Sequence, residues 1–357
     1  MMPLSSFSPT VREWFARAFA EPTAAQAQAW PAIAGGEHVL LSAPTGSGKT
    51  LAAFLWALDR LQSEGPAPPG TGTRVLYVSP LKALAYDIER NLRAPLRGIG
   101  ADAVSVGIRT GDTPQRDRAA MARNPPDIVI TTPESLYLIL TSRARSMLSG
   151  VQAVIVDEIH AVAHSKRGSH LSLTLERLQE QVTRSTGAQI QRIGLSATQS
   201  PLEEIGRFLV GPTREARIID AGVRKELDLR IEVPVESMAE PAQGADPAAD
   251  PLQPLAGGES TRGSIWPAIY PELLELVRAH RSTIIFVNNR RSAERVALRL
   301  NELAEREIAR AHHGSLAREE RTVVEELLKE GRLPCLVATS TLELGIELGA
   351  VDLVLQI

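Results

Sequence analysis

The chain has 357 residues, 43% of them apolar and 23% charged, proportions that are ordinary for a globular protein. At roughly 150 residues per domain, this length predicts two domains. The net charge of -3 excludes a histone-like protein that holds DNA by bulk charge, but it leaves room for a local basic groove. The single cysteine, Cys335, excludes a disulfide framework and a cysteine zinc cluster and fits a reducing cytosol. No apolar run reaches the ~18 to 20 residues that span a bilayer, so we expect a cytoplasmic protein without a membrane partner.

Short β-branched runs alternate with longer helical patterns through the first half of the chain. Because these runs are nearly all apolar, they are typical of strands covered on both faces, and the alternation predicts an α/β fold with parallel sheets. The helix after the first run carries one apolar stripe, formed by Leu51, Phe54, Leu55, Leu58 and Leu61. The predicted strands are Val39–Leu41, Val75–Val78, Val104–Ile108, Ile128–Ile130, Ala153–Val156 and Ile190–Leu195.

The pattern stops between Glu236 and Gly263, a stretch rich in Pro, Ala and Gly. Such a stretch cannot bury enough apolar surface to offset its ordering entropy, so we expect a flexible insertion over residues 236–263. We therefore expect one domain over residues 1–220 and a second over residues 221–357, with the insertion inside the start of the second. The strands predicted for the second sheet are Thr283–Val287, Ala309–His312, Cys335–Thr339 and Val351–Leu355, with Leu229–Val233 as a further candidate.

The chain ends at Ile357, directly after the apolar run Val351–Leu355 and before any helix that could cover it. A natural domain rarely ends on a fresh core strand. We therefore expect a truncated chain with an incomplete second domain, whose unfinished sheet exposes an edge strand.

Residues 43–50 spell Ala-Pro-Thr-Gly-Ser-Gly-Lys-Thr, directly after a predicted strand and at the start of the amphipathic helix. This context is typical of a phosphate-binding loop, in which backbone N–H groups and a helix N-terminus surround an anion. In such a loop Lys49 reaches the β- and γ-phosphates and the Thr50 hydroxyl holds Mg²⁺. The strict pattern begins with Gly where this chain has Ala43, a small residue that should still fit. The alternative is an ordinary Gly-rich turn between a strand and a helix.

Two further patterns point to nucleotide chemistry. The sequence Asp157-Glu158-Ile159-His160 ends a predicted strand, where one carboxylate can hold Mg²⁺ and the next can deprotonate an attacking water. Its alternative is an acidic helix start. Gln26 precedes the loop, and its amide is suited to the N6/N7 edge of adenine, although an exposed helix glutamine remains the other interpretation.

Several other segments follow predicted strands, at the sheet edge where ligands bind in parallel α/β folds. Each is weak alone. Thr132-Pro133-Glu134 is also simply a good helix start, and Arg290 and Arg291 could be solvated surface residues. The segments are Ser79–Leu84, Thr110–Asp112, Thr131–Ser135, Ser196–Thr198, Phe286–Arg290, His312–Gly314, Ala338–Thr341 and Gly345–Glu347.

The order of these segments resembles a superfamily 2 helicase with a DExH box, here spelled Asp-Glu-Ile-His. The amino-acid sequences of residues 285–291, 311–316 and 339–347 most resemble those of one family within it, the large helicase-related (Lhr) family. The resemblance implies two RecA-like domains that close on ATP and move along one nucleic-acid strand, typically 3′ to 5′ on DNA, with strand separation in DNA repair or recombination as the outcome.

The resemblance, together with the chemistry above, also implies roles for individual residues. Nucleotide and Mg²⁺ binding would involve Gln26, Thr45, Gly46, Ser47, Gly48, Lys49, Thr50, Asp157, Gly345 and Glu347. Hydrolysis would use Lys49, Asp157, Glu158 and His160, and the last of these would couple hydrolysis to strand movement together with Ser196 and Thr198. The nucleic-acid backbone would lie along Pro80, Lys82, Thr132, Pro133, Arg290 and Thr339.

This chain departs from the family pattern at its end, because it stops before a Gln-Arg-x-Gly-Arg stretch whose arginines reach the γ-phosphate. Loss of such an arginine typically removes ~10³ to 10⁵ of the hydrolysis rate, so we expect a chain that binds nucleotide but barely turns it over. Two alternatives stay open: an RNA helicase or remodeller of the same superfamily, and a nucleotide- and nucleic-acid-binding fragment without turnover. No residue reveals whether a 2′-hydroxyl is recognised.

Overall fold

The computed structural model describes residues 4–68, 70–80, 82–197, 200–222, 228–233, 266–339 and 351–357. The chain forms two compact units, Met1–Lys225 and Glu226–Ile357. The insertion that we predict over residues 236–263 lies outside the described residues.

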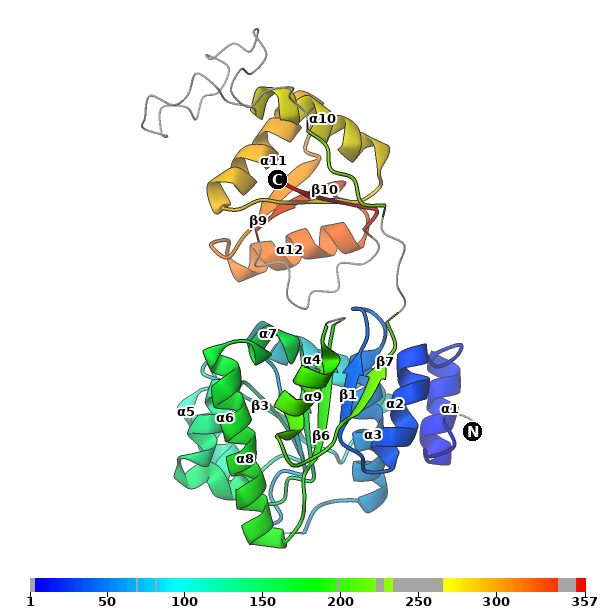
Figure 1. Cartoon of the computed structure of the whole chain (residues 1–357), viewed down its shortest axis with the longest axis vertical. Coiled ribbons are helices and arrows are strands. Elements are labelled where there is room, and N and C mark those ends of the chain that lie inside the picture. The colour runs from blue at the N-terminus through cyan, green and yellow to red at the C-terminus, as the bar shows by residue number, and fades with distance from the viewer. Residues whose placement is uncertain are drawn as a thin grey trace. The chain divides into compact units, whose positions relative to one another are not determined.

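The described part of the first unit is built on seven parallel strands, in the order β3-β4-β2-β5-β6-β1-β7 (Figure 1). The predicted α/β class with a parallel sheet is confirmed, although β7 was missed because only Ile219 of its four residues is buried. The strands are β1 (Val39–Ser42), β2 (Val75–Val78), β3 (Val106–Arg109), β4 (Ile128–Thr131), β5 (Ala153–Val156), β6 (Gln191–Ser196) and β7 (Arg217–Asp220).

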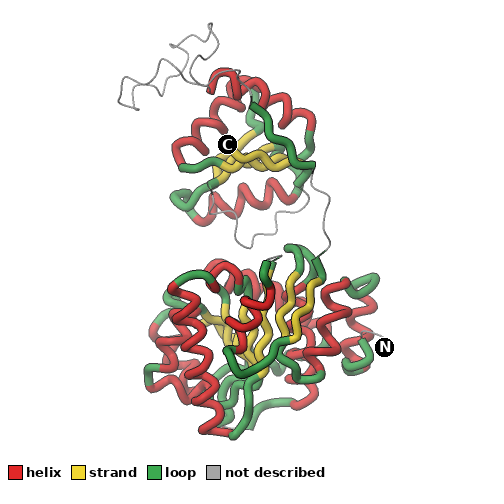
Figure 2. The backbone as a smooth tube through the Cα atoms, in the orientation of Figure 1, coloured by secondary structure: helices red, strands yellow, loops and turns green. Residues whose placement is uncertain are grey.

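Helices cover both faces of this sheet, as Figure 2 shows. Successive strand residues point to opposite faces, so Leu41 joins one apolar cluster and Leu40 the other. The cluster of Leu41 takes in α1 (Pro9–Ala18), α2 (Ala24–Ala34), α3 (Lys49–Glu64) and α4 (Lys82–Gly98). The opposite cluster takes in α5 (Gln115–Arg123), α6 (Pro133–Leu140), the 3₁₀ helix η1 (Arg143–Leu148), α7 (His160–Ala163), α8 (Lys166–Thr186) and α9 (Leu202–Val210).

The predicted apolar stripe lies on α3, the helix that begins at the phosphate-binding pattern. Phe54, Leu55, Leu58 and Leu61 of this stripe are buried against the sheet, and Leu51 packs at its margin. Burial of this stripe fixes the helix axis, and therefore the direction in which its N-terminus points.

The second unit is smaller. Its described sheet has four parallel strands in the order β11-β8-β10-β9, with α10 and α11 on one face and α12 on the other (Figure 1). Cys335 is buried in this core, as its apolar neighbours predict. The elements are α10 (Trp266–Ala279), β8 (Thr283–Phe286), α11 (Arg290–Ala304), β9 (Ala309–His312), α12 (Arg318–Lys329), β10 (Cys335–Ala338) and β11 (Leu353–Gln356).

The prediction of a strand at Leu229–Val233 is wrong. Leu229 and Ile231 are 83% and 90% exposed, and residues 228–233 join no sheet. Charged side chains alternate with the apolar ones here, and Arg230 pairs with its neighbour Asp228 at 2.8 Å. A segment of this composition does not match the sheet of the second unit, whose central strands are apolar on both faces.

Two further features concern surfaces. Strand β11 lies at one edge of its sheet, with Val354 57% exposed, as expected for an edge strand.

Across the described ranges, the helices fall short of the length and apolar character that crossing a bilayer demands.

Candidate nucleotide and nucleic-acid sites

The loop that joins β1 to α3 has the geometry of an anion cradle. Gly46 and Gly48 adopt φ of +79° and +78°, a left-handed conformation that L side chains rarely adopt and that turns successive N–H groups to one side. Lys49 is buried at the first position of α3, and its Nζ donates to the carbonyl oxygens of Ala43 at 2.6 Å and Pro44 at 2.9 Å. The ammonium group therefore lies at the base of the loop. Thr50 follows it, half-buried, in the first turn of the helix.

The acidic pair follows β5, at the same edge of the sheet. The Asp157 carboxylate is buried; its Oδ2 accepts a hydrogen bond from the Tyr77 hydroxyl, and its Oδ1 accepts one from the Glu158 N–H at 2.9 Å. Burial, together with the charge of Glu158, raises the pKa of Asp157 to about 6, against the opposing effect of Tyr77 and Lys49. Glu158 has a left-handed backbone with φ of 43°, and burial raises the pKa of its carboxyl as well. Strained backbone in a non-glycine residue is typical of functional sites.

The loop and the acidic pair belong to one site. Strand β6 separates β5 from β1, so the carboxyl ends of the three strands lie side by side. The Lys49 ammonium offsets part of the burial-driven rise in pKa at Asp157 and Glu158, and adds to the burial-driven fall in pKa at His160. The Lys49 ammonium therefore acts electrostatically on all three groups at this edge of the sheet.

His160 connects the acidic pair to the end of β6. Its Nδ1 accepts a hydrogen bond from the Ala197 N–H at 3.2 Å and lies 3.4 Å from the Ser196 hydroxyl. Burial lowers the pKa of His160, so the ring is neutral near pH 7 and carries its proton on Nε2. The structure thus brings together His160 and Ser196, two of the predicted coupling residues, whereas Thr198 lies outside the described residues.

The site has the donor set that a magnesium ion needs. Asp157 and Thr50 offer a carboxylate and a hydroxyl, which are hard oxygen ligands. Two carboxylates and one ammonium leave a net negative charge, and each Asp157 oxygen still has lone-pair capacity after one hydrogen bond. Over the ranges that the structure describes, no cluster of three His, Cys, Asp or Glu side chains could form a protein-only metal site. Mg²⁺ is usually held by one or two protein ligands together with phosphates.

The Gln26 side chain is buried beside the loop. It is 3% exposed, which excludes the interpretation as a surface residue. Its Oε1 accepts from the Thr23 N–H at 3.0 Å, as part of a capping box at the start of α2, and its Nε2 lies 3.4 Å from the Gly48 carbonyl oxygen. The amide is therefore locked next to the loop, and its predicted contact with adenine stays a prediction.

The residues predicted to line a nucleic acid in the first unit gather at the carboxyl ends of β2, β3 and β4. Lys82 is exposed, and its Nζ lies 2.7 Å from Asp112 at the end of β3. Thr132 and Pro133 are buried as the cap and first residue of α6, and Pro80 is buried after β2. These three can therefore offer a ligand mainly backbone groups and the shape of the loop.

Two functional candidates were missed by sequence reasoning. Tyr77 lies inside the predicted strand Val75–Val78 without being singled out, and Arg167 was assigned no role. No local pattern marks either residue, because their partners lie far away in the sequence. Tyr77 bonds to Asp157, and Arg167 bonds to Glu134 and Pro80.

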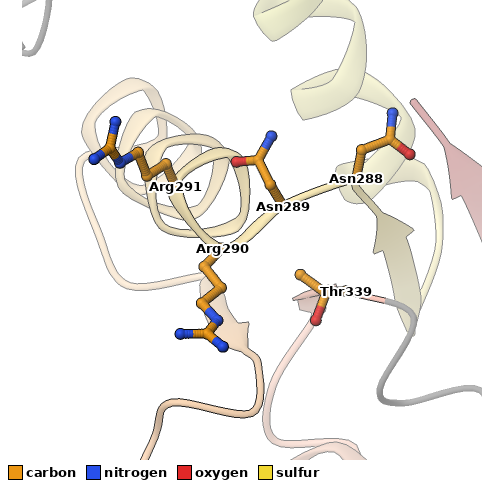
Figure 3. A pocket seen from close by; sticks show the side chains of 5 residues that line it. All are labelled: Asn288, Asn289, Arg290, Arg291 and Thr339. Carbon is orange, nitrogen blue, oxygen red and sulfur yellow. The ribbon is translucent and has the colours of Figure 1, made fainter. Parts of the chain in front are cut away.

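In the second unit, Arg290 and Thr339 line one open pocket with Asn288, Asn289 and Arg291. Figure 3 shows the Arg290 side chain on the side of α11 where Thr339 lies, whereas Arg291 points away. Gly345 and Glu347, which we predict to approach the nucleotide, lie outside the described residues.

Comparison with known proteins decides the family. A family model described as DEAD/DEAH box helicase matches residues 23–205, which include the loop, the acidic pair and Ser196. The chain belongs to the DEAD/DEAH box helicase family. A second model, described as helicase conserved C-terminal domain, matches residues 268–357.

Named relatives confirm the resemblance to the large helicase-related family. A Mycolicibacterium smegmatis protein named Lhr helicase/probable uracil glycosylase is 49% identical over 397 residues, which cover 99% of this chain and 25% of that protein. The Escherichia coli Lhr helicase/uracil glycosylase is 47% identical, with 98% of this chain and 25% of that protein covered. The ATP-dependent helicase Lhr-Core of Saccharolobus solfataricus is 42% identical, with 97% and 39% covered. The chain thus spans a quarter of the length of the first two relatives.

Solved helicase structures confirm the two RecA-like units. A structure of the Mycobacterium smegmatis helicase Lhr bound to ssDNA and AMP-PNP has a TM-score of 0.78 and 51% identity, and covers 100% of this chain and 44% of that one. The RNA-bound helicase Mss116p, with a TM-score of 0.72 and 18% identity over 99% of this chain and 67% of its own, shares the fold.

Proposed function

We propose that the chain is the nucleotide-binding core of an ATP-dependent helicase, a motor that hydrolyses MgATP to move along a single nucleic-acid strand, with DNA as its track. The observation that carries this proposal is that the loop of Lys49 and the acids Asp157 and Glu158 follow strands β1 and β5, whose carboxyl ends lie on either side of the end of β6. A phosphate-binding loop and a pair of acids that act on one another can bind a triphosphate and activate water beside it.

The residues divide the chemistry among them. The loop N–H groups and Lys49 bind the β- and γ-phosphates. Glu158 takes a proton from the water whose oxygen bonds to the γ-phosphorus as the bond from phosphorus to the ADP oxygen breaks. Its raised pKa makes it a stronger base than an ordinary glutamate. The side chains of His160 and Ser196 lie 3.4 Å apart and connect the acidic pair to the end of β6. They would transmit the loss of the γ-phosphate to the rest of the sheet edge.

Thr50 and Asp157 would hold Mg²⁺, which when bound neutralises phosphate charge and orients the triphosphate. A bound cation also favours the ionised form of Asp157, which burial disfavours. Mg²⁺-dependent nucleotide binding should therefore weaken as the pH falls through about 6.

DNA is favoured over RNA by one comparison. The solved relative at 51% identity is described as bound to ssDNA, whereas the RNA-bound neighbours are 18% identical and speak only for the fold. Travel from 3′ to 5′, a role in DNA repair or recombination, and the nucleotide and nucleic-acid roles of the second unit stay predictions from the family resemblance.

The test measures two binding events on the 357-residue chain. Binding of a fluorescent ATP analogue with Mg²⁺ is followed by fluorescence, and binding of labelled single strands of DNA and RNA with the same sequence is followed by anisotropy. We expect Lys49→Ala to abolish nucleotide binding and to leave DNA affinity within about twofold, because phosphate-backbone contacts lie elsewhere. Lys166→Ala, which removes the same charge from an exposed position, is the matched control.

Three outcomes would contradict the proposal. If the wild-type chain binds no nucleotide, the proposal of an ATP-driven motor is wrong. Nucleotide binding that survives Lys49→Ala removes the loop as its site. RNA bound more tightly than DNA replaces the DNA track with the RNA alternative.

A further inference from the structure

Arg167 joins two loops that leave the ends of different strands. It lies in the first turn of α8, and its Nη2 donates to the carbonyl oxygen of Pro80, after β2, at 2.9 Å. Its Nε donates to Oε1 of Glu134, in the first turn of α6 after β4, at 2.6 Å. Partial burial raises the pKa of Glu134, but the hydrogen bond and charge of Arg167, together with smaller local contributions, outweigh burial and hold the pKa below its ordinary value. The ion pair therefore stays formed at neutral pH.

The two loops are those that we propose to follow the nucleic-acid backbone. Pro80 belongs to one, and Thr132 caps the helix that begins the other. The Thr132 hydroxyl accepts the Ser135 N–H and donates to the Ser135 hydroxyl at 3.2 Å, so Thr132 fixes the start of the helix that carries Glu134, the partner of Arg167. Strands β2 and β4 are neighbours in the sheet, and a side chain that spans their ends sets the separation of the loops.

The base of Arg167 is itself fixed to the segment that carries the acidic pair. Helix α7 follows the acidic pair, and Ser165 then caps α8 by accepting the Gly168 N–H at 3.3 Å. A Cβ at Gly168 would lie 2.2 Å from the Val162 carbonyl oxygen, so the two helices approach as closely as glycine allows. Arg167 therefore extends from a rigid corner and not from a mobile loop.

We propose that Arg167 is a positioning residue for nucleic-acid binding, which holds the Pro80 loop and the Glu134 helix in one arrangement. The guanidinium donates to Glu134 and to the Pro80 carbonyl, and the Glu134 carboxylate offsets its charge, so we assign it to holding the loops and not to contacting a phosphate. This inference rests on the proposed function, because it needs these loops to contact the strand.

The test measures the affinity of the chain for labelled single-stranded DNA over a range of salt concentrations. We expect Arg167→Ala to weaken binding about tenfold without changing the slope of log K against log salt, because no phosphate contact is lost. A direct phosphate contact would instead lower the slope by about 0.7. A lower slope, or unchanged affinity, overturns the proposal.

Glu134→Ala separates positioning from simple electrostatics. Removal of an acid beside a polyanion strengthens binding if only charge matters, whereas loss of the anchor for Arg167 weakens binding. We expect weaker binding, and an Arg167→Ala/Glu134→Ala double variant no weaker than Arg167→Ala alone, because both act through one contact. Tighter binding by Glu134→Ala, or additive losses, contradicts the proposal.

Arg184 provides the matched control. It lies on the same helix about 26 Å from Arg167 and forms the same kind of ion pair, with Glu180 at 2.6 Å, on an exposed surface. Arg184→Ala should leave DNA affinity unchanged, and an equal loss in both variants overturns the proposal. If the wild-type chain itself binds no single-stranded DNA, the proposed function fails and this inference fails with it. If the wild-type chain binds single-stranded DNA and Arg167→Ala binds it equally well, only this inference fails.

Discussion

The Tyr77 hydroxyl donates a hydrogen bond to Oδ2 of Asp157, from one strand of the first sheet to the end of its neighbour. Both side chains are buried. Burial, and then the charge of Asp157, raises the pKa of Tyr77 well above 10, so the hydroxyl keeps its proton and remains a donor. The bond lowers the pKa of Asp157, which burial and Glu158 raise to about 6. Tyr77 therefore increases the fraction of Asp157 that is ionised near neutral pH.

Removal of this hydroxyl should shift the pH dependence of nucleotide binding. In Tyr77→Phe the ring can still stack on Phe54, whose centroid is 4.8 Å away, but Asp157 loses the bond that favours its charged form. We expect the acid limb of Mg²⁺-dependent nucleotide binding to move upward by about one pH unit. Titration of the ATP analogue from about pH 5.5 to 8.5, with Mg²⁺ and with a chelator, measures the shift. An acid limb that does not move contradicts the role of Tyr77.

Gly48→Ala should destabilise the first unit in a way that depends on Gln26. The left-handed backbone alone costs about 1 kcal/mol, and the new Cβ would lie 2.5 Å from Nε2 of Gln26. Gly46 has nearly the same φ but open space around it, so Gly46→Ala measures the backbone cost by itself. We expect Gly48→Ala to lose about 1–2 kcal/mol more than Gly46→Ala in urea unfolding. Adding Gln26→Ala to Gly48→Ala should recover part of the difference, and equal losses in both glycine variants would exclude the clash.

Glu176→Gln should destabilise the first unit at neutral pH. Arg192 is buried, and its Nη1 donates to Glu176 at 2.8 Å, while Arg214 pairs with the same carboxylate at 2.9 Å. Burial opposes the charged form of Glu176, but the hydrogen bonds from Arg214 and Arg192 lower its pKa to about 2. Because Glu176 is itself 41% exposed, solvent screening reduces the expected loss to about 1–2 kcal/mol.

The pH dependence of this loss has a definite sign. A depressed carboxyl pKa contributes stability that is complete above about 4.5 and is lost as the pH falls toward 2. The difference between Glu176→Gln and wild type should therefore shrink with acidification in denaturant titrations. Glu180→Gln, which breaks an exposed pair with Arg184, should cost less than about 0.5 kcal/mol. A gap between wild type and Glu176→Gln that is the same at every pH would argue against the ion pair.

His160 should be neutral at pH 7, with its proton on Nε2. Burial and the Lys49 ammonium lower its pKa, and its Nδ1 accepts the Ala197 N–H. Nitrogen chemical shifts of the labelled imidazole report both the tautomer and the titration midpoint. We expect the midpoint below 6.5, and a higher midpoint in Lys49→Met because one repelling charge is gone. A midpoint above 6.5 in the wild-type chain would contradict the effect of burial and Lys49, and a proton on Nδ1 would contradict the hydrogen bond from Ala197.

Local patterns were enough to find most elements of the fold. The apolar runs at Val75–Val78 and Ala153–Val156 match strands β2 and β5 in full. Strands that are buried on both faces consist almost entirely of apolar residues, so they are easily recognised in a sequence. The helix start at Thr132 was also visible, since an N-cap followed by proline is a local signal. Edge elements were harder: β7 was missed and Leu229–Val233 was wrongly assigned, because half-exposed strands and exposed coil share one alternating pattern.

The candidate site divides in the same way. The loop around Lys49 and the acids at Asp157 could be recognised in the chain because their chemistry needs particular residues at fixed, short spacings. Their convergence at one sheet edge, the hydrogen bond from Tyr77, and the bridge from Arg167 depend on which strands become neighbours. That order, β2-β5-β6-β1, follows from long-range packing of apolar faces. Spacing along the chain therefore specified the chemical groups, and only the folded sheet determined which of them interact.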